Sequence, residues 1–383
     1  MSVTTPRGFL AAGIAAGIKK SGALDLALVM NQGPSAAAAA VFTSNRAQAN
    51  PILWSKQAIA DGVVSAVILN SGGANCFTGP EGFQVTHRTA EAVGRALDIS
   101  AGDVLVCSTG LIGDQLNGDV LEAGAVSVAA ALSADGGESA ARAIMTTDSV
   151  PKLTAIERDG WSIGGMAKGA GMLAPGLATM LVVLTTDADL EARELETALR
   201  AATRLSFDRL DSDGCMSTND QVTLLASGAS GITPERDAFT EALTLACLDL
   251  AAQLQRDAEG ASHDITIEVV NARSEADAVE VGRSVARNNL FKAAIFGNDA
   301  NWGRVLAAIG TTAADFDPYR VDVSFNGVRL CSEGRPDRPR SEVDLSPRAT
   351  HVLIDLKAGS QTATILTNDL THDYVHENSA YSS

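Results

Sequence analysis

Short runs rich in β-branched residues alternate along this chain with longer stretches whose apolar residues recur every three or four positions. Runs of this length and content are typical of strands, and they stand at residues 66–69, 103–107, 180–184, 264–270 and 351–356. The clearest helical stripe carries Phe239, Leu243, Cys247, Leu250 and Leu254. Interleaved strands and helices predict an α/β fold, a layered sandwich of sheets and helices, whose strand order stays open.

The length and composition of the chain bound the size of that sandwich. The chain has 383 residues, more than a single hydrophobic core usually holds, so two lobes or one large layered domain are expected. Hydrophobic residues make up 46% of the sequence, but aromatic residues only 4%. The core must therefore be built mainly from alanine, valine, leucine and glycine.

Charge and hydropathy argue against several kinds of partner. The formal charge of −17 at pH 7 argues against nucleic acid and anionic membranes, while a local basic pocket for a small anion remains compatible with it. The first residues lack a signal-peptide pattern, and the apolar stretch at residues 10–18 is interrupted by glycine and too short to cross a bilayer. We therefore expect a cytoplasmic protein without a membrane span.

The cysteines and histidines show no pattern of metal or triad chemistry. The cysteines are dispersed, which predicts reduced thiols rather than a disulfide framework or a zinc site. They are Cys76, Cys107, Cys215, Cys247 and Cys331. The histidines form no recognisable triad, and no Gly-x-Ser-x-Gly motif is present. Surface or structural roles are expected for His87, His263, His351, His372 and His376. Neither a metal nor an organic cofactor is predicted.

The most unusual segment is the glycine-rich stretch at residues 163–181. Glycine permits close backbone approach, so such a loop can direct amide N–H groups toward an anion, with Lys168 as its positive charge. It can equally be a simple mobile connection. Dinucleotide binding is a weaker alternative: residues 169–174 fit Gly-x-Gly-x-x-Ala, but Pro175 and a β-branched run follow where that fingerprint needs a helix.

A third interpretation of this stretch is self-processing at the bond between Ala178 and Thr179. The Thr179 hydroxyl would attack the Ala178 carbonyl carbon, and water would then resolve the ester. The product is a threonine that carries both a hydroxyl and a free α-amine. An α-amine with a pKa of roughly 7.7–8.0 can serve as the local base near neutral pH. The residues alone do not exclude an ordinary loop-to-strand junction, where threonine is simply a β-former.

Motifs along the whole chain resemble the ornithine acetyltransferase (glutamate N-acetyltransferase) family of arginine biosynthesis. Residues 168–181 fit its signature Lys-Gly-x-Gly-Met-x-x-Pro-x-x-Ala-Thr-Met-Leu. Further ordered matches stand at residues 8–13, 41–45, 70–75, 108–113, 146–148, 217–220, 296–304 and 378–383. The resemblance implies a fold shared with certain self-processing aminopeptidases. It also implies an α chain of residues 1–178 and a β chain of residues 179–383, paired into an α2β2 heterotetramer.

The resemblance implies roles for individual residues as well. Thr179 is the nucleophile, and Thr109 with Gly110 forms the oxyanion hole, whose donors face the developing negative charge. The substrate-binding positions are Thr146, Lys168, Thr179, Glu259, Asn378 and Ser383. Lys168 suits a substrate carboxylate, and Glu259 suits an ammonium. The adjacent Thr147 leaves a one-residue ambiguity at Thr146. Without the family, Thr109 and Gly110 would be taken for a plain strand-exit turn.

This chain departs from the family pattern at a few positions. Ser262-His263 replaces the common Thr-Lys, which puts in doubt any charge contact that the lysine makes. Further departures are Gly73, Cys215, Met216 and Ala300, where asparagine, aspartate, threonine and proline are usual. None of these positions takes part in the expected covalent chemistry.

The implied reaction is a ping-pong acetyl transfer. N2-acetyl-L-ornithine would acetylate Thr179 and release ornithine, and L-glutamate would then take up the acetyl group. Whether acetyl-CoA is a second donor stays open, because both kinds of enzyme share these motifs. Two rivals remain. One is an N-terminal-nucleophile hydrolase that passes the acyl group to water, and the other is a small-anion-binding protein whose glycine loop is never cleaved.

Overall fold

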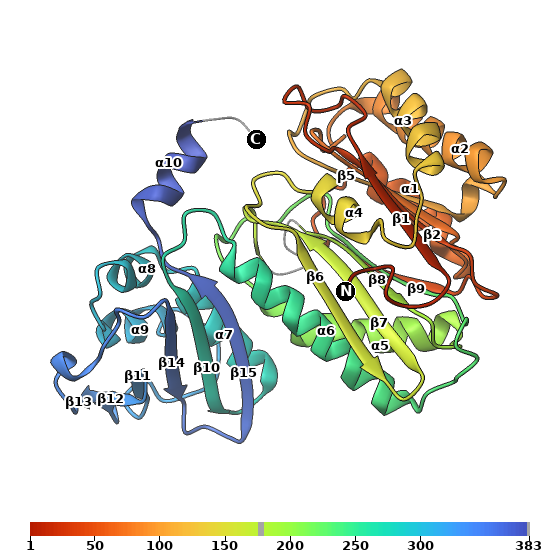
Figure 1. Cartoon of the computed structure of the whole chain (residues 1–383). Helices are drawn as coiled ribbons and strands as arrows, with labels where there is room; N and C mark the ends of the chain where they lie inside the picture. Colours follow the sequence, from red (N-terminus) through yellow and green to blue (C-terminus); the bar gives the residue numbers. More distant parts are fainter. Residues whose placement is uncertain (175–179, 381–383) are drawn as a thin grey trace.

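The computed structural model describes residues 1–174 and 180–380 (Figure 1). Within these residues the strands form three sheets, of which two face each other in one lobe and the third belongs to a second lobe. The chain enters the second lobe after helix α6 (Arg236–Arg256), and its last helix, α10 (His372–Ala380), extends back toward the first lobe. No helix in the described ranges is long and apolar enough to span a bilayer.

The first sheet of the larger lobe is built from the beginning of the chain. Its strands and helices are β1 (Phe9–Ile14), β2 (Leu26–Asn31), α1 (Asn50–Ala58), η1 (Ile59–Asp61), β4 (Ala66–Ser71), α2 (Gly79–Leu97), η2 (Ala101–Asp103), β5 (Val104–Thr109), α3 (Gly118–Ala130) and α4 (Gly137–Ala143). The strand order is β1-β2-β4-β5, and only the β4–β5 pair is parallel among these strands. Helices α2 and α3 cover the outer face of the sheet.

The second sheet of this lobe packs against the first. Its elements are β3 (Ala38–Phe42), β6 (Lys152–Arg158), β7 (Trp161–Lys168), β8 (Leu181–Thr186), α5 (Ala192–Leu205), η3 (Phe207–Arg209), β9 (Gln221–Ala226) and α6. The strand order is β3-β9-β8-β7-β6. Helices α5 and α6 cover its outer face, and the predicted α6 stripe at residues 239–254 is buried there. A stripe of this spacing lies on one face of a helix, which is why it packs on the sheet.

The two sheets of this lobe pack face to face around a common core. Val29, Leu69 and Leu105 of the first sheet meet Met166 and Val183 of the second. Because each sheet also carries helices on its outer face, its strands are buried on both sides, and β4, β5, β7, β8 and β9 are buried along their whole length. The lobe is therefore a helix–sheet–sheet–helix sandwich, and the predicted α/β class is confirmed.

The second lobe consists of one sheet with helices on one face. Its elements are β10 (Asp264–Ala272), α7 (Glu275–Ala286), α8 (Asn289–Phe296), α9 (Trp302–Ile309), β11 (Asp322–Phe325), β12 (Val328–Ser332), β13 (Arg335–Pro336), η4 (Arg340–Glu342), β14 (Ala349–Asp355), β15 (Gln361–Asn368) and the tail helix α10. The strand order is β13-β12-β11-β14-β10-β15. The alternating burial of β10 matches a strand with one face on the core of this lobe.

Candidate active site

A cavity of about 610 Å³ lies where the ends of β5 and β7 meet the loop after α6 and the tail helix α10. The candidate residues that the structure describes all line it, although they come from distant parts of the chain: Thr109, Gly110, Thr146, Lys168, Glu259 and Asn378. The proposed cleavage pair Ala178 and Thr179, and Ser383 at the chain end, lie outside the described residues. The fold therefore gathers six of the expected residues around one space.

A larger groove elsewhere on the molecule has a different character. It measures about 850 Å³ and lies between α5 with η3 and helix α7. Arg204 and Arg209 each contact Glu275 at 2.5 Å, and Arg287 contacts Asp211 at 2.7 Å, so its arginines are largely paired with carboxylates. None of the six described candidates lines this groove. Size alone does not make it the reaction site, and the smaller cavity is the better candidate.

The turn after β5 requires glycine at position 110. Gly110 has φ of +132°, a region that favours glycine, and a Cβ there would collide with the backbone nitrogen of Gly73. The Thr109 carbonyl accepts hydrogen bonds from Gly72 N and Gly73 N, each at 2.9 Å. Leu116 fills the space that a side chain at position 73 would need, which accounts for one departure from the family. The backbone thus fixes Thr109 at the edge of the cavity.

Lys168 joins two of the candidate hydroxyls. Its Nζ donates to Thr146 Oγ1 at 2.7 Å and to Thr109 Oγ1 at 3.3 Å, and it lies 3.9 Å from Asp148 Oδ2. The side chain is 2% exposed. Burial lowers the pKa of Lys168, and the Asp148 carboxylate opposes that shift. An ammonium held in this way orients the Thr109 and Thr146 hydroxyls.

Asp148 lies at the centre of a buried charge network behind the cavity. Its Oδ1 accepts from Lys152 Nζ at 2.6 Å and from Gly169 N at 2.7 Å, and Lys152 also contacts Asp257 at 2.5 Å. Burial alone would raise the pKa of Asp148, but Lys168 and Lys152 outweigh it and lower that pKa to about 2. The motif at residues 146–148 contains Asp148 but gave it no role, and no motif marks Lys152.

Glu259 organises the opposite side of the cavity. Its Oε1 accepts from Thr147 Oγ1 at 2.7 Å and its Oε2 from Asn378 Nδ2 at 2.9 Å. A Cβ on Gly171 would lie 2.6 Å from the carboxylate oxygens, so the glycine leaves room for Glu259. The adjacent threonines therefore have separate partners, with Thr146 facing Lys168 and Thr147 facing Glu259. Both line the cavity.

Tyr374 adds a neutral phenol near Glu259. It comes from α10 and lines the same cavity. Burial raises the pKa of Tyr374 to about 12, and Asp213 and Glu259 add to that shift because they are negatively charged. The phenol thus stays protonated at neutral pH and can donate a hydrogen bond to a ligand. No sequence motif marked this residue.

A buried carboxyl group lies beside the residue that follows Thr179. Asp220 Oδ1 accepts a hydrogen bond from Met180 N at 3.1 Å, and Asp220 is fully buried. Burial raises the pKa of Asp220 well above its usual range, although hydrogen bonds from Met180 N–H, Ser217 and Thr43 oppose that shift. Burial in this position therefore favours the protonated form of the Asp220 carboxyl. It belongs to the motif at residues 217–220, which gave it no individual role.

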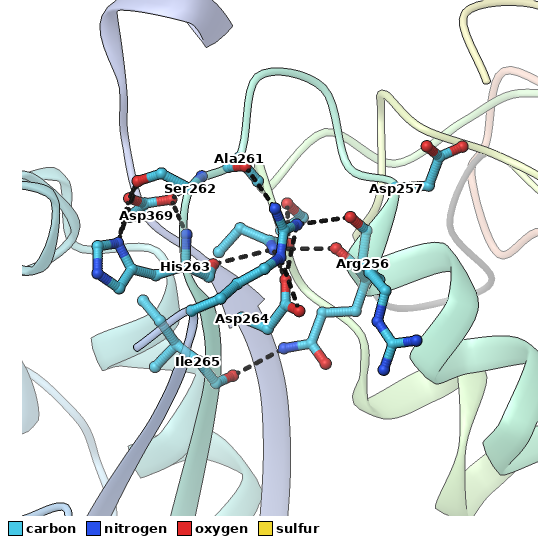
Figure 2. Close-up of polar contacts among 12 residues, drawn as sticks. Arg256, Asp257, Ala261, Ser262, His263, Asp264, Ile265 and Asp369 are labelled. Atoms are coloured by element: carbon cyan, nitrogen blue, oxygen red, sulfur yellow. Dashed lines mark hydrogen bonds and ion pairs between the residues drawn. The ribbon is translucent and has the colours of Figure 1, made fainter. Parts of the chain in front are cut away.

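Ser262, His263 and Asp369 form a cluster that resembles a catalytic triad only in composition (Figure 2). His263 Nδ1 lies 2.8 Å from Asp369 Oδ2, and its Nε2 lies 2.9 Å from the carbonyl oxygen of Leu345. Ser262 Oγ donates to Asp369. In a triad the second ring nitrogen would face the nucleophile hydroxyl, whereas here it faces a backbone oxygen. His263 has the structural role expected for it and contacts two acceptors where the family carries lysine.

The described residues hold no cluster of histidine, cysteine, aspartate or glutamate suited to a metal ion. Cys215 is a free thiol that lines the cavity. Burial raises the pKa of Cys215, and Asp213 adds to the shift, so its thiol is not activated as a nucleophile. The expectation that the protein uses no cofactor stays a prediction.

Comparisons with known proteins identify the family. The ArgJ family model matches residues 10–383. The arginine biosynthesis bifunctional protein ArgJ of Streptomyces coelicolor is 63% identical over 383 residues, with all of both chains covered. Its counterpart in Mycobacterium leprae is 55% identical over 389 residues, which cover 100% of this chain and 96% of that protein.

Among solved structures, this chain is similar to the ornithine acetyltransferase of Mycobacterium tuberculosis complexed with ornithine. The two are 56% identical with a TM-score of 0.45, over 47% of this chain and 96% of that chain. This chain is also similar to the arginine biosynthesis bifunctional protein ArgJ of Bacillus halodurans, with 33% identity and a TM-score of 0.49. That match covers 51% of this chain and 97% of that chain. The family match and the full-length identities confirm the resemblance. The chain therefore belongs to the ArgJ family, the glutamate N-acetyltransferases (ornithine acetyltransferases) of arginine biosynthesis.

Proposed function

We propose that this chain moves an acetyl group from N2-acetyl-L-ornithine to L-glutamate through an acetyl-Thr179 intermediate. One observation carries the proposal: hydroxyl, ammonium, carboxylate and amide groups from distant segments converge on one cavity of about 610 Å³. An amino-acid substrate carries charges of both signs, and this cavity is lined by the ammonium groups of Lys19 and Lys168 and by the carboxylate of Glu259. A member of this family with such a cavity is equipped for small amino-acid ligands.

The first step is self-cleavage. The Thr179 Oγ attacks the Ala178 carbonyl carbon, the peptide nitrogen leaves and is protonated, and an ester joins Ala178 to Thr179. Water then hydrolyses the ester, which leaves a carboxylate on Ala178 and a free α-amine on Thr179. The products are an α chain of residues 1–178 and a β chain of residues 179–383. The hydrogen bond from Met180 N to Asp220 supports this step, because it anchors the backbone next to Thr179.

The second step is acetyl transfer in two halves. The Thr179 α-amine accepts the hydroxyl proton, and Oγ attacks the acetyl carbon of N2-acetyl-L-ornithine. The Thr109 hydroxyl and the Gly110 N–H are the donors for the tetrahedral oxyanion. Ornithine leaves after its nitrogen takes the proton from the α-ammonium. In the second half, the α-amine of glutamate attacks the acetyl carbon of the ester and forms a second tetrahedral intermediate in the same oxyanion hole. Its collapse gives N-acetylglutamate, and the proton lost by the glutamate nitrogen passes through the Thr179 α-amine to Oγ, which frees Thr179.

The remaining features of the proposal concern binding and assembly. Glu259 with Asn378 would hold the amino-acid side chain, and Ser383 would close over it. The α and β chains would pair into an α2β2 heterotetramer in the cytoplasm, without a cofactor. The curated relatives are named bifunctional, which supports acetyl-CoA as a second donor to be tested with glutamate alone.

Two measurements separate this function from its rivals. On a denaturing gel, self-cleavage gives two fragments, whereas an anion-binding protein that never processes gives one band of 39.4 kDa. With purified cleaved protein, acetylglutamate must form from N2-acetyl-L-ornithine and glutamate. Acetate release without acetylglutamate would favour the hydrolase. A Thr179→Ala variant is expected to stay intact and inactive, and cleavage or transfer by that variant would contradict the proposal.

A further inference from the structure

Lys19 brings a second ammonium to the rim of the candidate cavity. It lies in the loop between β1 and β2 and lines the cavity near Gly72 and Thr109. Its Nζ donates to the carbonyl oxygens of Leu24 at 3.1 Å and Met145 at 2.7 Å. An ammonium has three N–H donors. Within the described part of the chain these two carbonyls are its hydrogen-bond partners, so one donor is left for a ligand in the cavity.

The loop that carries Lys19 is wrapped around one buried carboxylate. Asp25 is fully buried and accepts hydrogen bonds from four successive backbone N–H groups. The donors and distances are Ala16 at 2.6 Å, Gly17 at 3.2 Å, Ile18 at 2.6 Å and Lys19 at 2.9 Å. A carboxylate that accepts several backbone N–H bonds fixes the path of the loop. Asp25 thus acts as a positioning residue for Lys19.

The side chain of Lys19 packs against Gly72, whose backbone pairs with Thr109 of the predicted oxyanion hole. A Cβ on Gly72 would lie 3.4 Å from Lys19 Cγ and 3.0 Å from Ile18 Cγ2, so the glycine makes room for this loop. Gly72 N in turn donates to the Thr109 carbonyl at 2.9 Å. The Lys19 stem therefore lies beside the backbone that pairs with Thr109, and its ammonium is held at the carbonyl of Met145, the residue before Thr146.

Lys19 and Lys168 differ in what they can offer a ligand. Lys168 is 2% exposed, and its ammonium already faces Thr146, Thr109 and Asp148. Lys19 is only partly buried, and its two partners are neutral carbonyls. Burial lowers the pKa of Lys19, Asp25 opposes that shift, and Lys168 adds to it. A substrate carboxylate bound to Lys19 would accept a charge-assisted hydrogen bond. Its negative charge would offset the positive charges of Lys19 and Lys168.

We propose that Lys19 binds the α-carboxylate that N2-acetylornithine and glutamate share, while Lys168 orients the Thr109 and Thr146 hydroxyls. This inference rests on the proposed acetyl transfer. The α-carboxylate is one carbon away from the nitrogen that gains or loses the acetyl group, so its site must lie beside the oxyanion hole, as Lys19 does. The substrate side chain then extends toward Glu259, where the ammonium of ornithine finds a carboxylate.

The test compares Lys19→Met with the wild type on two donors: N2-acetylornithine and its amide, in which a neutral carboxamide replaces the α-carboxylate. Methionine keeps the apolar stem over Gly72 and removes the charge. On N2-acetylornithine we expect kcat/KM to fall about 10- to 100-fold, mainly through KM, as for the loss of a charge-assisted hydrogen bond. On the amide, variant and wild type should agree within about threefold. The control is Lys56→Met, which neutralises an exposed lysine outside the cavity.

A loss of equal size on both donors, or no loss on either, would overturn the assignment. Lys19→Gln serves as the second variant, because its amide can still donate to the Leu24 and Met145 carbonyls without carrying charge. Its kcat/KM must also fall on N2-acetylornithine while it stays near the wild-type value on the amide. Calorimetry of ornithine binding gives an independent reading, with an affinity expected to fall by the same factor in both variants. A wild type that binds ornithine but transfers no acetyl would contradict the proposed function, and calorimetry of the Lys19 variants would then still test the assignment of Lys19.

Discussion

Lys168 Nζ donates a hydrogen bond to Thr146 Oγ1 at 2.7 Å, and the same ammonium reaches Thr109 Oγ1 at 3.3 Å. One buried cation thus connects a predicted oxyanion residue with a predicted substrate-binding residue. Because both hydroxyl oxygens accept from Lys168, their O–H groups remain available to donate to a ligand in the cavity. This arrangement explains why the family signature carries lysine at a position with almost no solvent exposure.

Two substitutions of Thr109 distinguish the role of its hydroxyl from the role of its size. Thr109→Val removes the donor for the oxyanion, and kcat should fall about 100- to 1,000-fold, the usual effect of losing one such donor. Thr109→Ser keeps the hydroxyl and should stay within about tenfold of the wild type. Steady-state kinetics of acetylglutamate formation measures both. Equal losses in the two variants would show that the hydroxyl is not the group that matters.

The buried network around Asp148 predicts a pH-dependent contribution to stability. The folded pKa of Asp148 is about 2, below the ordinary value near 3.8, so its contribution is present above about pH 4 and is lost as the pH falls toward 2. A shift of this size corresponds to about 2–3 kcal/mol. Asp148→Asn should lower the free energy of unfolding, measured by urea denaturation at pH 7.

The difference in stability between the wild type and Asp148→Asn should shrink as the pH falls from about 4 to 2, because the unfolded wild-type chain takes up a proton on this carboxyl near pH 4 and the folded chain does so only near pH 2. Asp119→Asn is the matched control, since Asp119 forms an exposed ion pair with Arg88, and such pairs contribute little. A difference that is independent of pH would contradict the assigned role of the Asp148 charge.

Asp220 is expected to act as a neutral hydrogen-bonding group next to the cleavage site. Since burial raises its pKa well above the usual range, an amide should replace it. Asp220→Asn keeps an acceptor for Met180 N, and self-cleavage should proceed within about tenfold of the wild-type rate. Asp220→Leu removes that acceptor and should slow cleavage about 100-fold or more. Time courses on denaturing gels distinguish the two, and an Asn variant that cleaves as slowly as the Leu variant would show that the carboxylate charge is required.

Gly171 is expected to matter through the space it leaves for Glu259. In Gly171→Ala the new methyl group would meet the Glu259 carboxylate and shift it from Thr147 and Asn378. We expect KM for N2-acetylornithine to rise about tenfold, in line with the loss of one hydrogen bond to a charged group. Gly303→Ala is the control, because the added methyl group makes only an ordinary contact there. If both variants keep the wild-type KM, Glu259 does not need its observed position.

The sequence predicted the local elements well because their signals are local. The α6 stripe and the runs that became β4, β5, β8, β10 and β14 are set by the period of apolar residues over a few turns or one strand. Strand order within each sheet could not be predicted, since pairs such as β3 with β9 join residues 179 to 187 positions apart. The helix–sheet–sheet–helix stacking depends on those pairings.

The same distinction applies to the candidate site. The family resemblance assigned roles to Thr109, Lys168 and Glu259, whereas Lys19 and Lys152 stand in no motif. The role of Lys152 appears only when Asp257, 105 positions away, folds against it. Lys19 likewise acquires its place from Met145, 126 positions away. Groups whose partners are this distant in sequence leave no periodic or motif signal.

The most direct test of the central claim is the intact mass of the β chain after incubation with N2-acetylornithine in the absence of glutamate. We expect a chain that begins at Thr179, gains the mass of one acetyl group on that residue, and loses it again when glutamate is added. A protein that stays a single uncleaved chain, or a β chain that is never acetylated while acetylglutamate still forms, would show that Thr179 does not carry the acetyl group.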